Sequence, residues 1–199
     1  MIRPNIKRIV AILSWLFIIA GIVFFAYPFM TDLYYNFHQA KLADTFEEEN
    51  TSHSQIPTLD DTEAAARITP GGPMAVLEIP VINLSAVVIK GTSAENLAKG
   101  PGWYEESALP GHGNTAIAGH RSMYGGAFTK IENLKVDNVI LLKFNGKIYR
   151  YKVKELFTIE STDWSVTEPL EYTALTLTTC HPEGSSKRFV VRASLVSIR

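Results

Sequence analysis

The chain begins with a long apolar segment whose pattern differs from everything after it. The segment from Ile9 to Met30, IVAILSWLFIIAGIVFFAYPFM, contains no charged residue. As an α-helix it would extend roughly 33 Å, which is enough to cross the hydrocarbon core of a bilayer. A cleaved signal peptide usually has an apolar core of about 7–15 residues and a small-residue cleavage site. The pattern therefore predicts an uncleaved transmembrane anchor, with Pro28 near its outer end, where a kink costs least.

From residue 75 onward the pattern changes to short runs that are rich in Val, Ile, Leu, Tyr and Thr, several of which alternate. The runs are AVLEIPVINLSAVVI, NTAIAG, NVILLKF, KIYRYKVKELFTI, ALTLTT and RFVVRASLVSI. Clusters of Gly, Pro and Asn separate them, and Asn145-Gly146 is the strongest hairpin signal. Because a closed sheet hides the edges of many short strands, the prediction is an all-β fold, a closed or nearly closed β-barrel.

Short helices are expected between some of these strands. The segments SAENLAKG and AFTKIENL fit helical turns, and in the second Phe128, Ile131 and Leu134 recur at helical spacing. The chain from Met74 to Arg199 is long enough for one compact domain with its own core. The predicted organisation is a cytoplasmic N-terminus and anchor in residues 1–30, a linking segment in residues 31–74, and one domain in residues 75–199.

Charges beside the apolar segment predict its orientation. Arg3, Lys7 and Arg8 precede the segment, and Asp32 follows it. Because short cytoplasmic flanks are enriched in Lys and Arg, the N-terminus should lie in the cytoplasm. The rest of the chain is then expected outside the cell membrane, which it crosses once.

Net charge of −1 hides an acidic middle segment. Residues 31–74 carry two basic and eight acidic side chains, whereas residues 75–199 carry fourteen basic and twelve acidic. The start of the segment could continue as a juxtamembrane helix with Leu33, Phe37 and Leu42 near one face. We interpret residues 31–74 as an extracellular tether, whose charge should keep the domain away from anionic lipid rather than against it. Neither part indicates nucleic acid as a partner.

The single cysteine is the first candidate for chemistry. Cys180 ends the strand-like run at residues 176–180, TLTTC. Because side chains alternate along a strand, Leu175 and Leu177 should face the core and Cys180 the opposite face, and the same parity turns Arg188 outward on the next strand. If the two strands are neighbours, a thiol nucleophile and a fixed cation lie side by side. The alternative is a buried structural cysteine, since free Cys is among the most buried residue types.

A thiol nucleophile needs a proton-transfer partner, and the chain has five histidines. Two lie in the acidic segment, where a polar surface position explains them. His181 directly follows Cys180, so in a strand it should point away from the thiol. His112 lies in a Gly-Pro-rich turn, whereas His120 ends the run NTAIAGH, where small residues leave room for a cleft. The residues alone leave His120 as the first candidate and His112 as the second.

Three motifs together resemble the sortase family of Gram-positive cell-surface transpeptidases. They are ALPGHGNTAIAGHR with His120, TLTTC with Cys180, and KRFVVRA with Arg188. The segment LEIPVINLSAVVIKGTSAENLAKGPGWY is similar to the family's first strands and helix, and anchor, linker and barrel follow in the family's order. The resemblance covers nearly the whole chain. It implies a closed sortase-type β-barrel in which Cys180 is the nucleophile, His120 the general acid/base and Arg188 the cation that orients substrate and stabilises the oxyanion.

The resemblance also implies the reaction and its partners. Cys180 would attack a threonine carbonyl in an LPxTG-like C-terminal sorting signal of a secreted protein, and His120 would protonate the leaving amine. Arg188 would donate to the developing oxyanion. An amine of the peptidoglycan cross-bridge or its precursor would then take the acyl group. We expect no cofactor and no required metal.

Specificity is expected to depend on the loop before the nucleophile strand, STDWSVTEPLEY. Trp164, Val166 and Leu170 could form an apolar wall for the signal, although ordinary core cover is the alternative for Trp164. Thr178 and Thr179, beside the nucleophile, are further candidates for substrate binding. The carboxylates of this loop are not patterned as a calcium site.

Other functions remain open at this point. The short link from His181 to Lys187 and the form AGHR look closer to class D and class E sortases than to class A. A pilin-polymerising sortase is the weaker option, because the chain shows no second apolar run and no Asp-Pro-aromatic lid motif. A cell-surface cysteine peptidase or hydrolase would use the same Cys–His pair, and a non-catalytic anchored β-domain is a third possibility.

Overall fold

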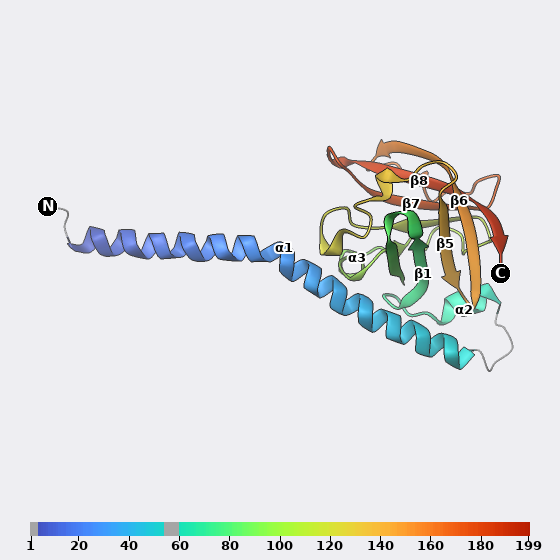
Figure 1. The fold of residues 1–199 in the computed structure, drawn as a ribbon, viewed down its shortest axis with the longest axis horizontal. Coiled ribbons are helices and arrows are strands. Elements are labelled where there is room, and N and C mark those ends of the chain that lie inside the picture. The colour runs from blue at the N-terminus through green and yellow to red at the C-terminus, as the bar shows by residue number, and fades with distance from the viewer. Residues whose placement is uncertain (1–3, 54–59) are drawn as a thin grey trace.

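A β-barrel and a long N-terminal helix make up the protein in a computed structural model, which describes residues 4–53 and 60–199 (Figure 1). The helices, 3-10 turns included, are α1 Pro4–His53, α2 Asp61–Arg67, η1 Pro80–Ile82, α3 Ala94–Lys99, η2 Tyr124–Gly126 and η3 Ile131–Asn133. The strands are β1 Pro73–Ile79, β2 Leu84–Lys90, β3 Gly102–Trp103, β4 Asn114–Ala118, β5 Val139–Phe144, β6 Lys147–Glu160, β7 Ala174–His181 and β8 Gly184–Ile198.

The strands close into one barrel in the order β1-β2-β3-β4-β7-β8-β6-β5. The pairs β2–β3 and β4–β7 are parallel, and the remaining pairs are antiparallel. Closure leaves no long free edge, as expected for a domain of many short strands. The predicted closed barrel with short helices is confirmed.

Alternating side chains fill the barrel interior. On β5, Ile140, Leu142 and Phe144 are buried, whereas the residues between them are partly exposed. The turn after β5 is the predicted hairpin, because Asn145 and Gly146 both have positive φ, 49° and 72°. The core is completed by buried residues from other strands and loops, among them Leu77, Ile117, Phe128, Ile131, Tyr149, Tyr151, Leu175, Leu177 and Val191.

The two predicted helical segments are both present, in different forms. α3 occupies SAENLAKG, and the Ser93 hydroxyl caps its start by accepting from the backbone N–H of Asn96 at 3.2 Å. In AFTKIENL the helix is only the short 3-10 turn η3. Phe128, Ile131 and Leu134 are nevertheless buried, so their spacing predicted the apolar face correctly.

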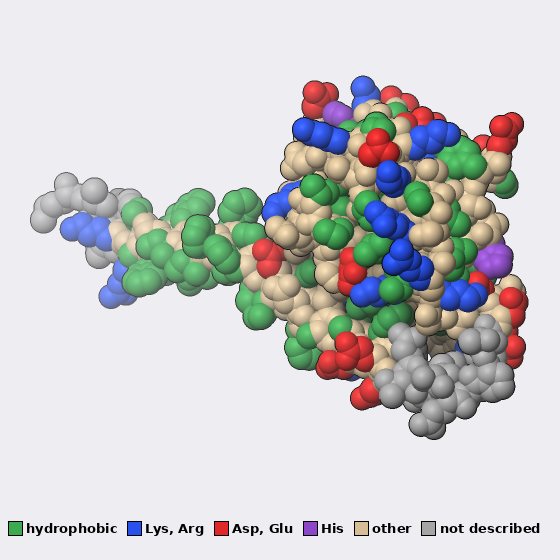
Figure 2. All heavy atoms as spheres, turned by 45° about the vertical axis from the view of Figure 1, so that its right-hand side comes forward, with side chains coloured by type: hydrophobic (Ala, Val, Ile, Leu, Met, Phe, Trp, Pro, Cys, Tyr) green, Lys and Arg blue, Asp and Glu red, His purple; other side chains and the backbone are tan. Residues whose placement is uncertain are grey.

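The first half of α1 projects away from the barrel as an apolar rod (Figures 1 and 2). Its large side chains are exposed, including Trp15 at 66% and Phe24 at 83%. By length and composition this helix can cross a membrane, which is consistent with a single-pass anchor. α1 bends about midway (Figure 1), and Pro28 lies within it, where the missing N–H and the ring disturb the helical ladder.

The second half of α1 runs along the barrel (Figure 1). The Oδ1 atom of Asp32 accepts from the backbone N–H of Gly125 at 2.9 Å. Leu33 and Phe37 are exposed, at 64% and 65%, whereas Leu42, the third residue of the predicted apolar face, is half-buried. Polar side chains of the helix bind the barrel, and the interpretation of residues 31–74 as a tether that keeps the domain away from anionic lipid stays a prediction.

Gln39 makes the clearest of these contacts. Its side-chain oxygen accepts from the N–H of Val87 at 2.7 Å, and its amide donates to the carbonyls of Val87 at 3.1 Å and Lys99 at 2.9 Å. β3 spans only two residues and pairs with β2 only at Ile89 and Lys90, so it does not reach Val87. The amide therefore takes the place of a neighbouring strand for this part of β2.

α2 belongs to the barrel domain, although it precedes the expected boundary at residue 75. Ala65 is buried in the core, and the Lys90 ammonium donates to the carbonyls of Ala65 at 3.1 Å and Ile68 at 3.0 Å. The domain therefore extends upstream at least to Asp61, the first residue of α2.

Asp61 fastens α2 to the barrel. Its side chain is 4% exposed and accepts from Asn145 at 2.8 Å, Lys147 at 2.9 Å and Tyr149 at 3.0 Å, and it contacts His112 at 3.0 Å. Burial opposes ionisation of this carboxyl, but the four hydrogen bonds outweigh burial and lower its pKa to about 2. Asp61 is therefore a stably charged anchor between α2 and the barrel.

Candidate active site

Cys180 and Arg188 form a cross-strand pair. β7 and β8 are antiparallel neighbours, and their register sets Cys180 opposite Arg188. Side chains of directly opposed residues lie on the same face of a sheet, with Cβ atoms about 4.5–5.5 Å apart. Both residues are half-buried, and Leu175 and Leu177 face the core. The predicted parity is confirmed, and it brings a thiol and a guanidinium together.

His120 lies at the same end of the neighbouring strand. β4 and β7 are parallel, with Ala118 paired to Thr178, so His120 and Cys180 each follow two residues beyond that pair. Two hydrogen bonds prolong the alignment past β4. The N–H of Gly119 donates to the carbonyl of Thr178 at 3.0 Å, and the hydroxyl of Thr179 donates to the carbonyl of Gly119 at 2.8 Å.

Burial governs the proton affinity of His120. The imidazole is half-buried, and loss of hydration lowers its pKa below the ordinary 6.5 because the charged form is disfavoured. The ring of Tyr124 lies 5.5 Å from the ring of His120, centroid to centroid. At neutral pH the imidazole is therefore mainly uncharged and can accept a proton from a thiol.

The structure separates His112, the second candidate, from the thiol. His112 precedes β4 and His120 follows it, so the two lie at opposite ends of that strand. The Nε2 atom of His112 is 3.0 Å from Asp61 Oδ2. His181 directly follows Cys180, and its Nδ1 accepts from the N–H of Glu183 at 3.2 Å.

Thr178 and Thr179, which precede Cys180 on β7, are buried rather than open to solvent. Each is 2% exposed. The Thr178 hydroxyl is 3.2 Å from the Tyr104 hydroxyl, and the Thr179 hydroxyl is bound to the carbonyl of Gly119. Their hydroxyls support the strands that carry Cys180 and His120.

Asn114, which was not among the predicted site residues, holds the loop that precedes β7. Its amide donates to the carbonyls of Val166 at 2.8 Å and Glu168 at 2.9 Å, and its oxygen accepts from the Thr176 hydroxyl at 2.7 Å. Asn114 is 1% exposed. An amide at the start of an otherwise apolar strand was the available signal, because a buried amide needs partners.

The three apolar loop residues have different environments. Trp164 is 65% exposed, so it is not core cover. Its ring meets Tyr104 edge-on with centroids 6.3 Å apart, and Tyr104 in turn contacts Thr178. Val166 is 3% exposed and Leu170 is half-buried. Trp164 thus presents an open aromatic face next to β7, whereas Val166 packs beneath the loop.

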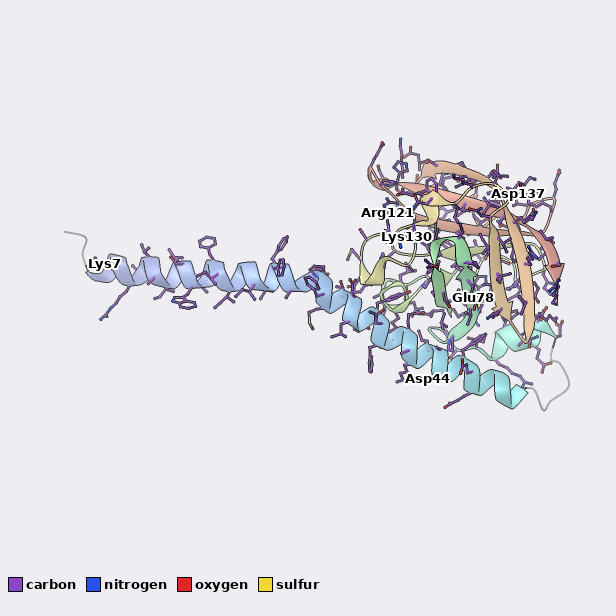
Figure 3. The ribbon with its side chains drawn as sticks, in the orientation of Figure 1. Lys7, Asp44, Glu78, Arg121, Lys130 and Asp137 are labelled. Carbon is purple, nitrogen blue, oxygen red and sulfur yellow. The ribbon has the colours of Figure 1, made fainter. Side chains whose placement is uncertain are left out.

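Arg121, the residue after His120, forms an ion pair with Glu132 that was not predicted. Two of its nitrogens lie 2.9 Å from the two oxygens of Glu132. This ion pair, in which Nη2 donates a hydrogen bond to Glu132, lowers the pKa of Glu132. Figure 3 shows Arg121 at the end of the barrel toward the bend of α1. The ion pair ties the residue after His120 to η3.

Within the part of the chain that the structure describes, no three His, Cys, Asp or Glu side chains gather closely enough to hold a metal ion. In the loop before β7 the carboxylate of Asp163 accepts from the N–H of Ser165 at 2.9 Å. That carboxylate organises its own turn.

Known proteins resemble this chain in both sequence and fold. The sequence profile of the Sortase domain matches residues 77–196. The chain belongs to the sortase family. It is 28% identical to sortase A of Bacillus anthracis, over 98% of each chain. Sortases are cysteine transpeptidases, and this sortase is therefore a cysteine transpeptidase.

Solved sortase structures share the fold. The sortase D5 transpeptidase of Clostridium perfringens is 27% identical with a TM-score of 0.67, covering 75% of this chain and 95% of that chain. Sortase E1 of Streptomyces coelicolor, solved with a tripeptide in the active site, is 29% identical with a TM-score of 0.62, covering 66% of this chain and 93% of that chain. The sortase barrel therefore extends over most of the residues after α1.

Proposed function

We propose that Cys180 is the nucleophile of this sortase, His120 its general acid/base and Arg188 the cation that stabilises the oxyanion. The observation that carries the proposal is that β7 is hydrogen-bonded to β8 on one side and to β4 on the other. The first pairing sets Arg188 opposite Cys180, and the second continues through Gly119 to His120. A cysteine transpeptidase needs a thiol, and Cys180 is the only cysteine in the chain.

Acylation transfers a peptide from nitrogen to sulfur. The Cys180 sulfur bonds to the carbonyl carbon of the substrate, the C–N bond breaks, and the leaving amine takes a proton from His120. His120 gains that proton from the thiol, which its lowered pKa permits because the imidazole is uncharged at neutral pH. An incoming amine then attacks the thioester, gives its proton to His120, and releases the thiol.

Arg188 acts on the carbonyl oxygen. Negative charge develops there as the sulfur adds, and a guanidinium on the same sheet face as the thiol can donate hydrogen bonds to it. The planar fork of Arg suits two donors at once, whereas Lys offers a single point charge. The nearby Arg192 serves another purpose, since it pairs with Glu155 at 3.1 Å and stacks on Phe157.

The substrate we propose is an LPxTG-like sorting signal near the C-terminus of a secreted protein, cleaved after Thr. Trp164 offers an open aromatic face for the apolar part of the signal, and Leu170 is the second contact we propose. The acceptor is an amine of the peptidoglycan cross-bridge or its precursor. A class D or class E type of specificity remains our proposal from the sequence.

We place the enzyme at the cell surface as a single-pass membrane protein. The apolar half of α1 is the anchor, the basic N-terminus lies in the cytoplasm, and the barrel lies outside. Residues 1–30 then form the cytoplasmic end and anchor, residues 31–74 the connection, and residues 75–199 the catalytic domain, to which α2 contributes.

The experiment that tests this proposal uses the full chain in lipid nanodiscs. It is incubated with LPxTG-, LPNTA- and LAxTG-type peptides, each with and without an amine acceptor. Amine-dependent ligation supports transpeptidation, whereas cleavage at equal rate without acceptor assigns a hydrolase. Cys180→Ala should abolish product and thioester, and full activity in that variant would remove Cys180 from the mechanism. If none of the peptides is cleaved or forms an adduct with the thiol, the result favours a non-catalytic role for the protein.

A further inference from the structure

The helix next to the membrane anchor contacts the loop that follows His120. Asp32 of α1 accepts a hydrogen bond from the N–H of Gly125, in η2, at 2.9 Å. The ring of Tyr35 lies directly against Gly125, so that a Cβ added there would overlap it. Burial raises the pKa of the Tyr35 hydroxyl to about 12. α1 therefore meets η2 through both a hydrogen bond and an aromatic contact.

Aromatic rings continue this contact to the imidazole. Tyr34 of α1 meets Tyr124 edge-on, with ring centroids 6.3 Å apart. Tyr27, near the outer end of the apolar half of α1, raises the pKa of the Tyr124 hydroxyl. The Tyr124 ring is also 5.5 Å from the ring of His120, centroid to centroid. Tyr124 thus lies between α1 and the proposed general acid/base.

The conformation of η2 needs support from outside. Tyr124, Gly125 and Gly126 have successive φ values of 48°, 71° and 50°. A bulky residue with positive φ is uncommon and strained, and it persists when surrounding contacts hold it. The hydrogen bond to Asp32 falls within this left-handed run.

The barrel holds the two ends of the same loop. Arg121 is paired with Glu132, and the N–H of Phe128 donates to the carbonyl of His120 at 3.0 Å. The hydroxyl of Thr129 donates to the carbonyls of Arg121 and Gly126. These contacts flank Tyr124 and Gly125, which themselves are met by α1. The middle of the loop therefore depends on the membrane-proximal helix.

We propose that the segment of α1 from Asp32 to Tyr35 is a positioning element of the active site, which holds η2 so that the Tyr124 ring fixes the imidazole of His120. The inference rests on the proposed role of His120. It means that the membrane anchor and the catalytic centre are joined through one continuous helix. Asp32, Tyr35 and Tyr124 are positioning residues, because they act through His120.

The test uses full-length protein in phospholipid nanodiscs with a sorting peptide that the wild-type enzyme cleaves. Asp32→Ala removes the acceptor for Gly125, and we expect kcat to fall about fivefold with KM for the peptide unchanged, as for loss of one hydrogen bond that orients a catalytic group. Asp32→Asn keeps an acceptor oxygen and should restore kcat. Asp44→Ala is the matched control, since it removes the same charge from an exposed position farther along α1 (Figure 3).

A second pair of variants examines the ring. Tyr124→Phe removes the hydroxyl and keeps the aromatic contact with His120. Tyr124→Ala removes both the hydroxyl and the ring. We expect Tyr124→Ala to lower kcat by more than Tyr124→Phe, again without a rise in KM.

Unchanged kcat in both Asp32→Ala and Tyr124→Ala overturns the inference, as does a rise in KM alone, which would assign the segment to substrate binding. Equal loss in Asp32→Asn and Asp32→Ala also overturns it. The proposed function is tested separately, because Cys180→Ala and His120→Ala should be inactive whichever result the α1 variants give.

Discussion

Cys180 and Arg188 occupy opposed positions on β7 and β8, so the thiol and the guanidinium share one face of the barrel wall. The backbone hydrogen bonds of two paired strands fix this relation. On the other side of β7, the hydroxyl of Thr179 holds the carbonyl of Gly119. The three proposed catalytic residues thus lie on three adjacent strands or on their direct continuation.

Arg188→Lys should reduce kcat by about tenfold or more while protein stability stays unchanged. The substitution keeps the positive charge but loses the planar fork that can donate two hydrogen bonds to an oxyanion. Steady-state kinetics of peptide ligation measure the effect, and thermal unfolding checks the fold. Lys130→Ala is the control, since Lys130 is a basic residue whose side chain is exposed (Figure 3). Wild-type kcat in Arg188→Lys would exclude the proposed fork contact.

His120 should titrate below 6.5 in the folded protein, because burial disfavours its charged form. Its pKa is therefore lower in the folded than in the unfolded chain, and the folded imidazole loses its proton first as the pH rises. NMR of protein with labelled histidine measures the midpoint. Removing the adjacent ring in Tyr124→Ala should move the midpoint upward toward 6.5. A His120 midpoint at or above 6.5 in wild type would contradict the inferred burial.

Features set by local backbone geometry could be predicted from the sequence. The Asn145-Gly146 hairpin follows from two residues that tolerate positive φ. Leu175 and Leu177 face the core because a strand alternates with a period of two. The same period turned Cys180 and Arg188 to one face, although only the structure shows that their strands are neighbours.

Features that depend on segments distant in sequence could not be predicted. Gln39 binds β2 because β3 is too short to cover Val87, which no local pattern reveals. Asn114 and Arg121 find their partners only once a loop folds over β7 and η3 packs against the barrel. The sequence placed His120 ahead of His112, but only the pairing of β4 with β7 shows which end of β4 lies beside Cys180.

Trp164→Ala should raise KM for the sorting peptide about tenfold with little change in thermal stability. Its ring is 65% exposed, so the free enzyme loses little packing, whereas a bound apolar side chain would lose an aromatic contact worth about 1.5 kcal/mol. Val166→Ala is the contrasting variant. Val166 is 3% exposed, so this change should lower the melting temperature while Trp164 stays available. An unchanged KM in Trp164→Ala would move the binding surface elsewhere.

Asp61→Asn should destabilise the protein by about 2 kcal/mol at neutral pH, because the neutral amide cannot replace the charge that Lys147, Tyr149 and Asn145 stabilise. The folded-state pKa of Asp61 is lowered from 3.8 to about 2, so its contribution is fully present above pH 3.8 and is lost as the pH falls toward 2.

The stabilities of the wild-type protein and Asp61→Asn should therefore converge at acid pH. Thermal unfolding as a function of pH measures this. Asp60→Asn is the matched control, since the neighbouring carboxylate is exposed and makes no side-chain cap bond to α2. In Asp61→Asn the kcat of molecules that remain folded should equal the wild-type value, because Asp61 binds His112 at the end of β4 away from Cys180. If the stability difference between wild type and Asp61→Asn does not shrink between pH 4 and pH 2, the charge of Asp61 is not what fastens α2 to the barrel.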